Sequence, residues 1–356
     1  MVLHPRSNAH LMSELFGPEN CFRGQHVVSA DQFDLGSLAQ LMKAAELIRK
    51  VPGMFHGMLR DKILATFFTQ ESTRTRLSFE ASMLRLGGGV ISTTDASKTS
   101  SEVKGETLED TISIISGYCD IIVLRHHRTG SAKLASEYSL VPLINGGDGR
   151  GEHPTQALVD LYTIWSQLGR LEGLRLAVVG DLLHGRTIHS LLKALSLYTG
   201  NEVTCVSDPE LSLPEDLRTS LEDKGLRLTA TQNLVDTVRL VDVVYVTRIQ
   251  ANLFEDKCKE ESRAQGKNPE DVEVKKLIEE QVVEFKARTA GKYILFPELL
   301  PQLEEDEGVV WLMHPLPRNE EIPRSMDSYS GSIYIKQARE NAMDIRRALL
   351  AMILGK

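Results

Sequence analysis

Residues 63–86 read ILATFFTQESTRTRLSFEASMLRL, an apolar run followed by a short polar loop and an amphipathic segment. The run Ile63–Phe68 is apolar on both faces, which is typical of a strand buried in a parallel sheet. Helical spacing of apolar residues follows over 75–86. A buried strand that leads directly into a helix is the repeating unit of α/β domains, so this stretch predicts a parallel sheet covered by helices on both faces.

The same alternation continues in two series along the chain, with helical patterns at 106–118, 154–168 and 335–354. Short apolar runs predict the remaining strands at 90–94, 121–126, 142–145, 174–180, 202–207, 226–229, 243–247, 293–296 and 309–313. We therefore expect an α/β protein with two doubly wound domains, each a parallel β-sheet flanked by helices, joined by interdomain helices. The first domain is expected over 1–155 plus 333–356, and the second over 156–332.

The composition is that of an ordinary globular protein, with 356 residues, 42% hydrophobic, 25% charged and a net charge of −8. It lacks the basic footprint of a nucleic-acid binder, and no apolar run reaches transmembrane length. The N-terminal residues lack the apolar core of a signal peptide, so we expect a cytoplasmic protein, or a domain of a longer polypeptide. The widely spaced cysteines, Cys21, Cys119, Cys205 and Cys258, predict neither a disulfide framework nor a metal site.

The strongest local motif is S-T-R-T-R at residues 72–76, between the first strand and its helix. Hydroxyl side chains cap a helix, and the N–H groups of a helix N-terminus bind phosphate. Arg74 adds a guanidinium fork that matches phosphate oxygens. The structural alternative is plain capping with solvated arginines, but three hydroxyls and two arginines in five residues favour a phosphate site.

Three further arginines lie at predicted strand ends, where open α/β sheets place their ligands. Arg125 ends the strand at 121–126, Arg186 follows the strand at 174–180, and Arg248 follows the strand at 243–247. Arg186 and Arg248, on separate loops, suit the two carboxylates of a diacid; the alternative is two unrelated surface arginines. The loop after residue 179 lacks G-x-G-x-x-G, which argues against a nicotinamide dehydrogenase.

Two histidine motifs complete the set. In H-P-T-Q, His153 and Gln156 are three residues apart at a helix start, so both can face a small carbonyl-amide group. In H-P-L-P-R at 314–318, two prolines hold the intervening carbonyl groups rigid, and a cis bond before Pro317 is expected. The structural alternatives are a satisfied histidine and a stiff turn between domains.

The segment 255–286 breaks the pattern because it is dominated by Glu, Lys, Asp and Gln. Such a composition favours a solvated helical insertion or a surface loop. Its place directly after the Arg248 loop makes a lid the less favoured alternative.

In this order the motifs resemble those of the aspartate/ornithine carbamoyltransferase family, from about Gln32 to Leu354. The aspartate branch is favoured, because H-P-L-P-R stands where ornithine enzymes carry a catalytic cysteine motif. The run G-D-L-x-x-G-R-T-x-H-S and Ser100 followed by K-G-E-T at 104–107 are also similar to that branch. The resemblance implies transfer of the carbamoyl group from carbamoyl phosphate to L-aspartate, giving N-carbamoyl-L-aspartate and phosphate. This reaction is the committed step of de novo pyrimidine biosynthesis, and it implies no cofactor and no metal.

The resemblance also implies a role for each candidate residue. Carbamoyl phosphate would be bound by Ser72, Thr73, Arg74, Thr75, Ser100, Lys104, Arg125, His153, Gln156, Pro315 and Leu316. Aspartate would be bound by Lys104, Arg186, Arg248, Gln250 and Leu316. The catalytic contacts would be made by Arg74, Thr75, Lys104, Arg125 and His153. Ser100 and Lys104 would reach into a neighbouring subunit's site, so a homotrimer with shared sites is implied.

Two positions depart from the family pattern. Gln70 stands where the family has a glutamate, and Leu253 stands where it has an arginine; in the family these two charges pair across the closing domains. We therefore expect closure to be stabilised differently here, with the insertion at 255–286 as the candidate element.

Two alternatives stay open at this point. One is a carbamoyltransferase with another amino-acid acceptor, which an acceptor screen would identify. The other is a non-catalytic trimeric homologue that binds ligand without turnover. The sequence also leaves open whether a regulatory chain binds, and whether the chain is one part of a larger pyrimidine-pathway polypeptide.

Overall fold

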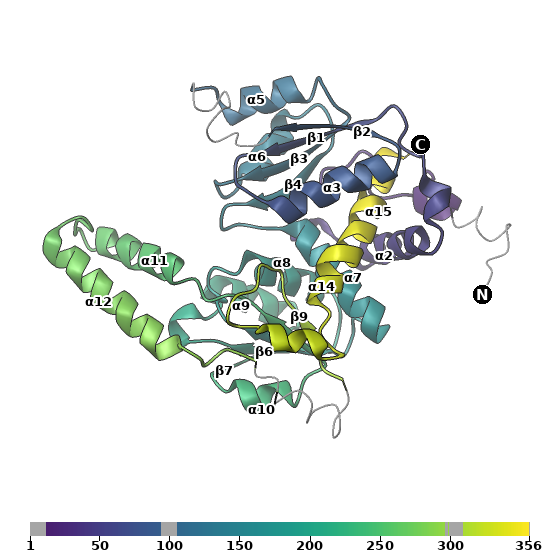
Figure 1. The fold of residues 1–356 in the computed structure, drawn as a ribbon. Coiled ribbons are helices and arrows are strands. Elements are labelled where there is room, and N and C mark those ends of the chain that lie inside the picture. Colours follow the sequence, from purple (N-terminus) through teal and green to yellow (C-terminus); the bar gives the residue numbers. More distant parts are fainter. Residues whose placement is uncertain (1–11, 94–104, 296–297, 299–308, 356) are drawn as a thin grey trace. The chain divides into compact units, whose positions relative to one another are not determined.

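The computed structural model describes residues 12–93, 105–295, 298 and 309–355. The chain forms two compact units (Figure 1). Unit 1 comprises Met1–Leu171, Arg186–Thr199 and Ile335–Lys356, and unit 2 comprises Glu172–Gly185 and Gly200–Tyr334. These bounds differ from the sequence-based division at 155/156, because the helix at 154–168 and the helix that begins at Arg186 both belong to unit 1.

Unit 1 contains a four-stranded sheet in which every pair of neighbouring strands is parallel, in the order β2-β1-β3-β4. Its strands are β1 (Ile63–Phe68), β2 (Gly89–Thr93), β3 (Ile121–His126) and β4 (Leu143–Asp148). The bounds of β1 and β3 are those predicted from the apolar runs. The parallel sheet confirms the predicted fold class for this part of the chain.

The helices of unit 1 cover this sheet and bury its apolar faces. They are η1 (Ala30–Gln32), α2 (Leu35–Lys50), η2 (Pro52–Phe55), α3 (Thr73–Arg85), α5 (Leu108–Ile115), α6 (Ser131–Tyr138), α7 (Pro154–Leu168), α8 (Arg186–Leu195) and α15 (Ala342–Leu354). The C-terminal helix α15 packs against α2 and α3, so the last residues of the chain complete the first unit. Helix α7 has the bounds predicted from sequence, with Pro154 in its first turn.

Unit 2 contains a five-stranded parallel sheet in the order β7-β6-β5-β8-β9. Its strands are β5 (Arg175–Val179), β6 (Glu202–Val206), β7 (Arg227–Thr231), β8 (Val243–Val246) and β9 (Trp311–Met313). Its helices are η4 (Pro209–Leu211), α9 (Glu215–Asp223), α10 (Leu234–Val238), α11 (Ala251–Ala264), α12 (Val272–Thr289) and η5 (Arg324–Ser328). The core of this unit includes Val179, Val206, Val244 and Leu312, which come from four neighbouring strands.

The strand predicted at 293–296 is wrong over its described part. Tyr293 lies in a turn that follows α12, and the backbone N–H of Leu295 donates to the carbonyl of Glu321, 3.2 Å away. Both side chains are buried, so the apolar run reports burial without strand pairing.

Two further predictions concern the C-terminal half of the chain. The predicted helix at 335–354 is present as α14 (Tyr334–Lys336), a π-helical turn η6 (Gln337–Asn341) and α15. The cis bond predicted before Pro317 is confirmed, because the Leu316–Pro317 peptide is cis. No helix among the described residues is both long enough and apolar enough to cross a membrane.

Candidate active site

The candidate residues of unit 1 lie at the point where its strand order reverses. Strand β1 pairs with β2 on one side and with β3 on the other, so the loops after β1 and β3 leave the sheet in opposite directions. Phe68 pairs with Arg125, and the N–H of Thr69 donates to the carbonyl of Arg125 at 2.9 Å. The S-T-R-T-R motif follows β1, and Arg125 lies in β3. Ligands bind at such switch points in open α/β sheets.

The N-terminus of α3 is open to a ligand. Ser72 is the N-cap residue, but its hydroxyl makes no capping hydrogen bond, so the first N–H groups of the helix have no side-chain partner at the cap. Thr75 is buried, while Thr73 and Arg74 are exposed. A helix start without a side-chain cap, with hydroxyl groups and an arginine in its first turn, has the chemistry of a phosphate site.

Arg125 is the centre of a group of positive charges. Its Nη1 donates to the carbonyl of Gly146 at 2.9 Å, and its buried Nε has no hydrogen-bond partner among the described residues. Burial, followed by the positive charges of Arg186 and Arg74, lowers the pKa of Arg125 to about 9. A bound anion would relieve both effects, because it would supply an acceptor and an opposite charge.

Gly147 allows two of these guanidinium groups to approach the backbone. Its φ of +115° is a conformation that side chains disfavour. A Cβ atom at this position would lie 2.7 Å from Nη1 of Arg125 and 3.4 Å from Cζ of Arg186. The glycine thus leaves the space that the arginine pair occupies.

Arg186 begins α8 and donates from its Nη1 to the carbonyl of Gly149. Burial lowers its pKa, and the carboxylate of Asp148 offsets part of this effect. The structure therefore places Arg186 beside Arg125 in unit 1.

His153 and Gln156 stand at the start of α7 in states suited to an uncharged ligand group. Burial, followed by the charges of Arg125, Arg186 and Arg346, holds the pKa of His153 well below 6.5, so its imidazole is neutral at pH 7. The amide of Gln156 donates to Oδ1 of Asp160 at 2.8 Å, which leaves its carbonyl oxygen to accept a hydrogen bond.

Arg346, on α15, is a member of this group that the sequence analysis missed. It is buried, with 3% exposure, donates to the hydroxyl of Ser78 on α3, and stacks over the ring of Phe79 at 5.1 Å. Burial lowers its pKa to about 10, with a further contribution from Arg74, while Asp160 acts in the opposite direction. Arg346 therefore adds positive charge beside α3. No local motif marks it, because it comes from the opposite end of the chain.

The remaining candidates lie in unit 2, also at a switch point, since β5 pairs with β6 on one side and with β8 on the other. Arg248 and Gln250 follow β8, and Nη2 of Arg248 lies 3.4 Å from Oε1 of Gln250. The two side chains therefore form one polar group at this strand end.

Hydrogen bonds of His314 fix the backbone of the H-P-L-P-R motif. The N–H of Leu316 donates to Nδ1 of His314 at 2.7 Å, and Nε2 of His314 lies 3.0 Å from the carboxylate of Glu321. Leu316 has a φ of +57°. These contacts orient Pro315 and Leu316, whose carbonyl oxygens were expected to bind an amide.

Ser100 and Lys104 lie outside the described residues, so their predicted contacts are not part of this geometry. Gln70, at the first departure from the family pattern, has a buried Oε1 without a hydrogen-bond partner among the described residues. In the part of the chain that the structure describes, no group of three or more His, Cys, Asp or Glu side chains is arranged to hold a metal ion.

Comparison with known proteins places this two-domain fold and its arginine-rich strand ends in one class, the carbamoyltransferases. Residues 25–166 match the aspartate/ornithine carbamoyltransferase carbamoyl-P binding domain, and residues 172–353 match the Asp/Orn binding domain. The chain belongs to the aspartate/ornithine carbamoyltransferase family.

The similar proteins described next come from the aspartate branch of that family. An aspartate carbamoyltransferase catalytic subunit of Methanococcoides burtonii is 41% identical over 338 residues, covering 94% of this chain and 98% of the relative. The solved catalytic subunit of M. jannaschii aspartate transcarbamoylase is 40% identical, with a TM-score of 0.77 over 92% of this chain and 96% of that one. Aspartate transcarbamoylase from Trypanosoma cruzi, solved in complex with carbamoyl phosphate and aspartate, is 29% identical, with a TM-score of 0.81 over 96% of this chain and 99% of that one.

Proposed function

We propose that this protein transfers the carbamoyl group of carbamoyl phosphate to the amine of L-aspartate, giving N-carbamoyl-L-aspartate and phosphate. The observation that carries the proposal is the group of arginines around the open N-terminus of α3. The charges of Arg74 and Arg186 act on Arg125, and burial lowers the pKa of both Arg125 and Arg186. Such a group is stabilised by an anion, and the family defines that anion as carbamoyl phosphate.

The donor is bound at its two ends by different chemistry. Ser72, Thr73, Arg74 and Thr75 hold the phosphate through hydroxyl, guanidinium and helix N–H donors. The carbonyl oxygen of Gln156 accepts from the carbamoyl amide, together with the backbone carbonyls of Pro315 and Leu316. This arrangement leaves the carbamoyl oxygen for Thr75, Arg125 and His153.

The reaction forms a C–N bond and breaks a C–O bond. The neutral amine of aspartate attacks the carbamoyl carbon, negative charge grows on the carbamoyl oxygen, and phosphate leaves. Thr75, Arg125 and neutral His153 donate to that oxygen, and one such donor typically contributes about 100- to 1,000-fold in rate. The leaving phosphate accepts the proton that the amine loses. Holding both substrates side by side supplies much of the remaining acceleration.

The acceptor site and the assembly complete the proposal. Arg186, Arg248 and Gln250 bind the two carboxylates of aspartate, assisted by Leu316. Ser100 and Lys104 act in the site of a neighbouring subunit, so the active unit is a homotrimer with three shared sites. The relatives are named aspartate carbamoyltransferase, which favours aspartate over ornithine as the acceptor. We place the activity in cytoplasmic pyrimidine biosynthesis.

Formation of carbamoyl aspartate by the purified protein tests the activity. We expect turnover by the wild type and a loss of about 100-fold or more in Arg74→Ala and in Lys104→Ala. Arg60→Ala is the matched control. The exposed Arg60 precedes β1 and so lies near the N-terminal ends of the strands, whereas Arg74 follows their C-terminal ends. A wild type that releases no product with any amine acceptor would reject the proposal.

Shared sites make a second, independent prediction. Mixing Arg74→Ala and Lys104→Ala subunits should restore part of the activity, because some sites in the mixed trimers take both wild-type residues. Mixtures that stay as inactive as the single variants would show that Arg74 and Lys104 act within one subunit.

A further inference from the structure

The insertion after the Arg248 loop forms a helical hairpin with an apolar core of its own. Helices α11 and α12 run beside each other as the two long green helices in Figure 1. Phe254, in the first turns of α11, and Phe285, in the last turns of α12, stack with ring centroids 4.0 Å apart and planes inclined by 7°. The core is therefore centred where the hairpin joins unit 2. Its buried members are Leu211, Phe254, Cys258, Ile278, Val282 and Phe285.

Charged contacts fix this end of the hairpin to the loop after β6. Arg288, near the end of α12, donates from Nε and Nη2 to the two carboxylate oxygens of Asp208, at 2.9 and 3.0 Å, and from Nη2 to Glu210 at 2.6 Å. Asp208 is only 1% exposed, so the forked pair is shielded from water on the acid side. Lys257 of α11 donates to the carbonyl of Glu210 at 3.3 Å. Both helices thus hold the same short segment of the domain.

The hairpin also holds the loop that carries the acceptor-binding residues. Ile249 lies between Arg248 and Gln250, and its side chain packs against both the hairpin core and the core of the unit 2 sheet. Helix α11 begins directly after Gln250, which is its N-cap residue. Any shift of the hairpin is therefore transmitted to the residues on either side of Ile249.

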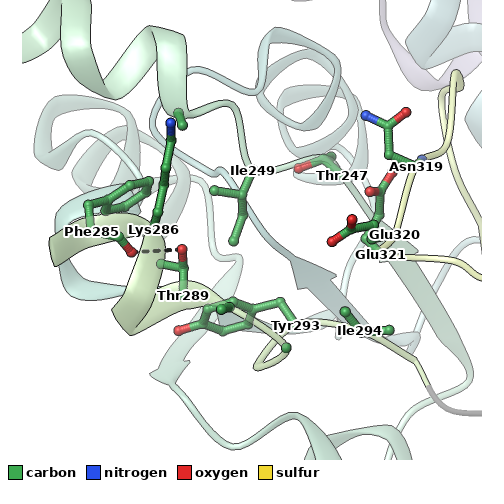
Figure 2. Close-up of a pocket in the computed structure, with 13 residues that line it drawn as sticks. Thr247, Ile249, Phe285, Lys286, Thr289, Tyr293, Ile294, Asn319, Glu320 and Glu321 are labelled. Atoms are coloured by element: carbon green, nitrogen blue, oxygen red, sulfur yellow. Dashed lines mark hydrogen bonds between the residues drawn. The ribbon is translucent and has the colours of Figure 1, made fainter. Parts of the chain in front are cut away.

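A cavity of about 650 Å³ lies between this loop, the end of α12 and residues 319–321. Figure 2 shows the side chain of Ile249 at this cavity, with Phe285 and Thr289 of α12 on one side and Asn319 and Glu320 on the other. The side chain is therefore incompletely packed by the domain itself. Its contact with the hairpin supplies an important part of its support.

We infer that the α11–α12 hairpin is a support that positions Arg248 and Gln250 for the acceptor, with Ile249, Phe254 and Phe285 as positioning residues. The inference rests on the proposed function for the identity of the acceptor. It assigns the hairpin to the acceptor half of the reaction, because its contacts are with the Arg248 loop and the loop after β6. Loosening the hairpin should weaken the use of aspartate and leave the donor site unchanged.

The test compares Phe285→Ala with Val283→Ala, a control on the exposed face of the same helix, where Val283 is 66% exposed. In Phe285→Ala we expect the KM for L-aspartate to rise roughly ten- to a hundredfold, since a misplacement of about 1 Å can cost about a hundredfold. The KM for carbamoyl phosphate should stay within about twofold of the wild type, which a generally damaged protein would not achieve. Phe285→Leu, which restores apolar volume, should recover most of the loss.

A second measurement reports positioning without substrate. Backbone amide hydrogen exchange over residues 247–253 should become faster in Phe285→Ala, while exchange over β5 stays at the wild-type rate. Arg288→Gln, which loosens the anchor without emptying the core, should change both readouts in the same direction by a smaller amount.

The outcomes separate this inference from the activity itself. If the wild type forms carbamoyl aspartate but Phe285→Ala keeps the wild-type KM for aspartate and the wild-type exchange rates, the hairpin does not position the loop and the inference is overturned. If the wild type uses no acceptor, the proposed function is rejected, and the role of the hairpin in acceptor binding is rejected with it. A rise in both KM values together would show a general structural role and would also overturn the inference.

Discussion

Replacing Gly147 by alanine tests the arginine arrangement with the smallest available change. The substitution adds a Cβ atom 2.7 Å from Nη1 of Arg125, whereas ordinary contacts begin near 3.4 Å, so the guanidinium must retreat by roughly 0.7 Å. The φ of +115° adds backbone strain, which typically costs about 1–3 kcal/mol for a side chain held in such a region.

The expected result is a large loss of activity with a moderate loss of stability. Displacing one donor to the developing oxyanion should lower kcat/KM by about 100-fold, within the range of about 100- to 1,000-fold for removal of such a donor. Steady-state formation of carbamoyl aspartate measures the first effect, and thermal unfolding measures the second.

Gly169→Ala provides the matched control. Gly169 ends α7 with a φ of +68°, and a Cβ there would meet nothing within 4 Å. This variant should lose stability through backbone strain and keep its kcat/KM. Equal losses of activity in the two variants, or full activity in Gly147→Ala, would refute the reasoning that Gly147 makes room for Arg125.

Three further predictions concern charge. The pKa of buried His153 is held well below 6.5, so below about pH 6.5 this histidine takes up a proton in the unfolded chain but not in the folded chain. The folded state is therefore less stable below that pH than above it. Between about pH 7 and about pH 5.5, the unfolding temperature of the wild type should fall more than that of His153→Asn. Glu152→Gln should lower the free energy of unfolding by about 1–3 kcal/mol, because Glu152 accepts from Lys193 at 2.7 Å in a half-buried setting. Asp31→Asn changes the more exposed partner of the same lysine and should lower the free energy of unfolding by under about 1 kcal/mol. Chemical denaturation measures both values. Inorganic phosphate should inhibit competitively with carbamoyl phosphate. Its inhibition constant should rise roughly ten- to a hundredfold in Arg74→Ala, because a hydrogen bond to a charged group contributes about 1.5–3 kcal/mol. An unchanged inhibition constant would show that Arg74 does not bind the phosphate.

The sequence predicts the parts of the fold that are bounded by strong local signals. The runs at β1 and β3 are apolar on both faces and end at polar loops, and the proline at the start of α7 and the glycine at its end mark that helix clearly. The segment at 293–296 carries the same apolar signal, but Tyr293 lies in a turn and residues 294–295 are irregular. The prediction failed here because burial alone does not distinguish a strand from a packed loop.

The hairpin was harder to predict because its apolar residues pack mainly on one another. Phe254 and Cys258 on α11, and Ile278, Val282 and Phe285 on α12, form only narrow stripes at helical spacing between many charged residues, so no broad apolar face appears in the sequence. Composition therefore left a helical insertion and a surface loop as alternatives.

The candidate site was predictable where residue type and position coincide in a short motif, as in S-T-R-T-R. It was not predictable where a side chain reaches the site from a distant part of the chain. Arg346 lies in an ordinary-looking helix, and only the packing of α15 against α3 brings it to Ser78. Gly147 lies at the end of β4, and only the positions of two distant arginines show why it lacks a side chain.

The position of α15 also has a consequence for biosynthesis. Unit 1 contains both the first and the last residues of the chain, and α15 packs between its helices. Helix α15 must therefore leave the ribosome before unit 1 can finish folding, whereas unit 2 is fully translated earlier. A truncated chain that ends just before residue 342 should contain a folded unit 2 and an unfinished unit 1, which reverses the usual order in which N-terminal domains fold first.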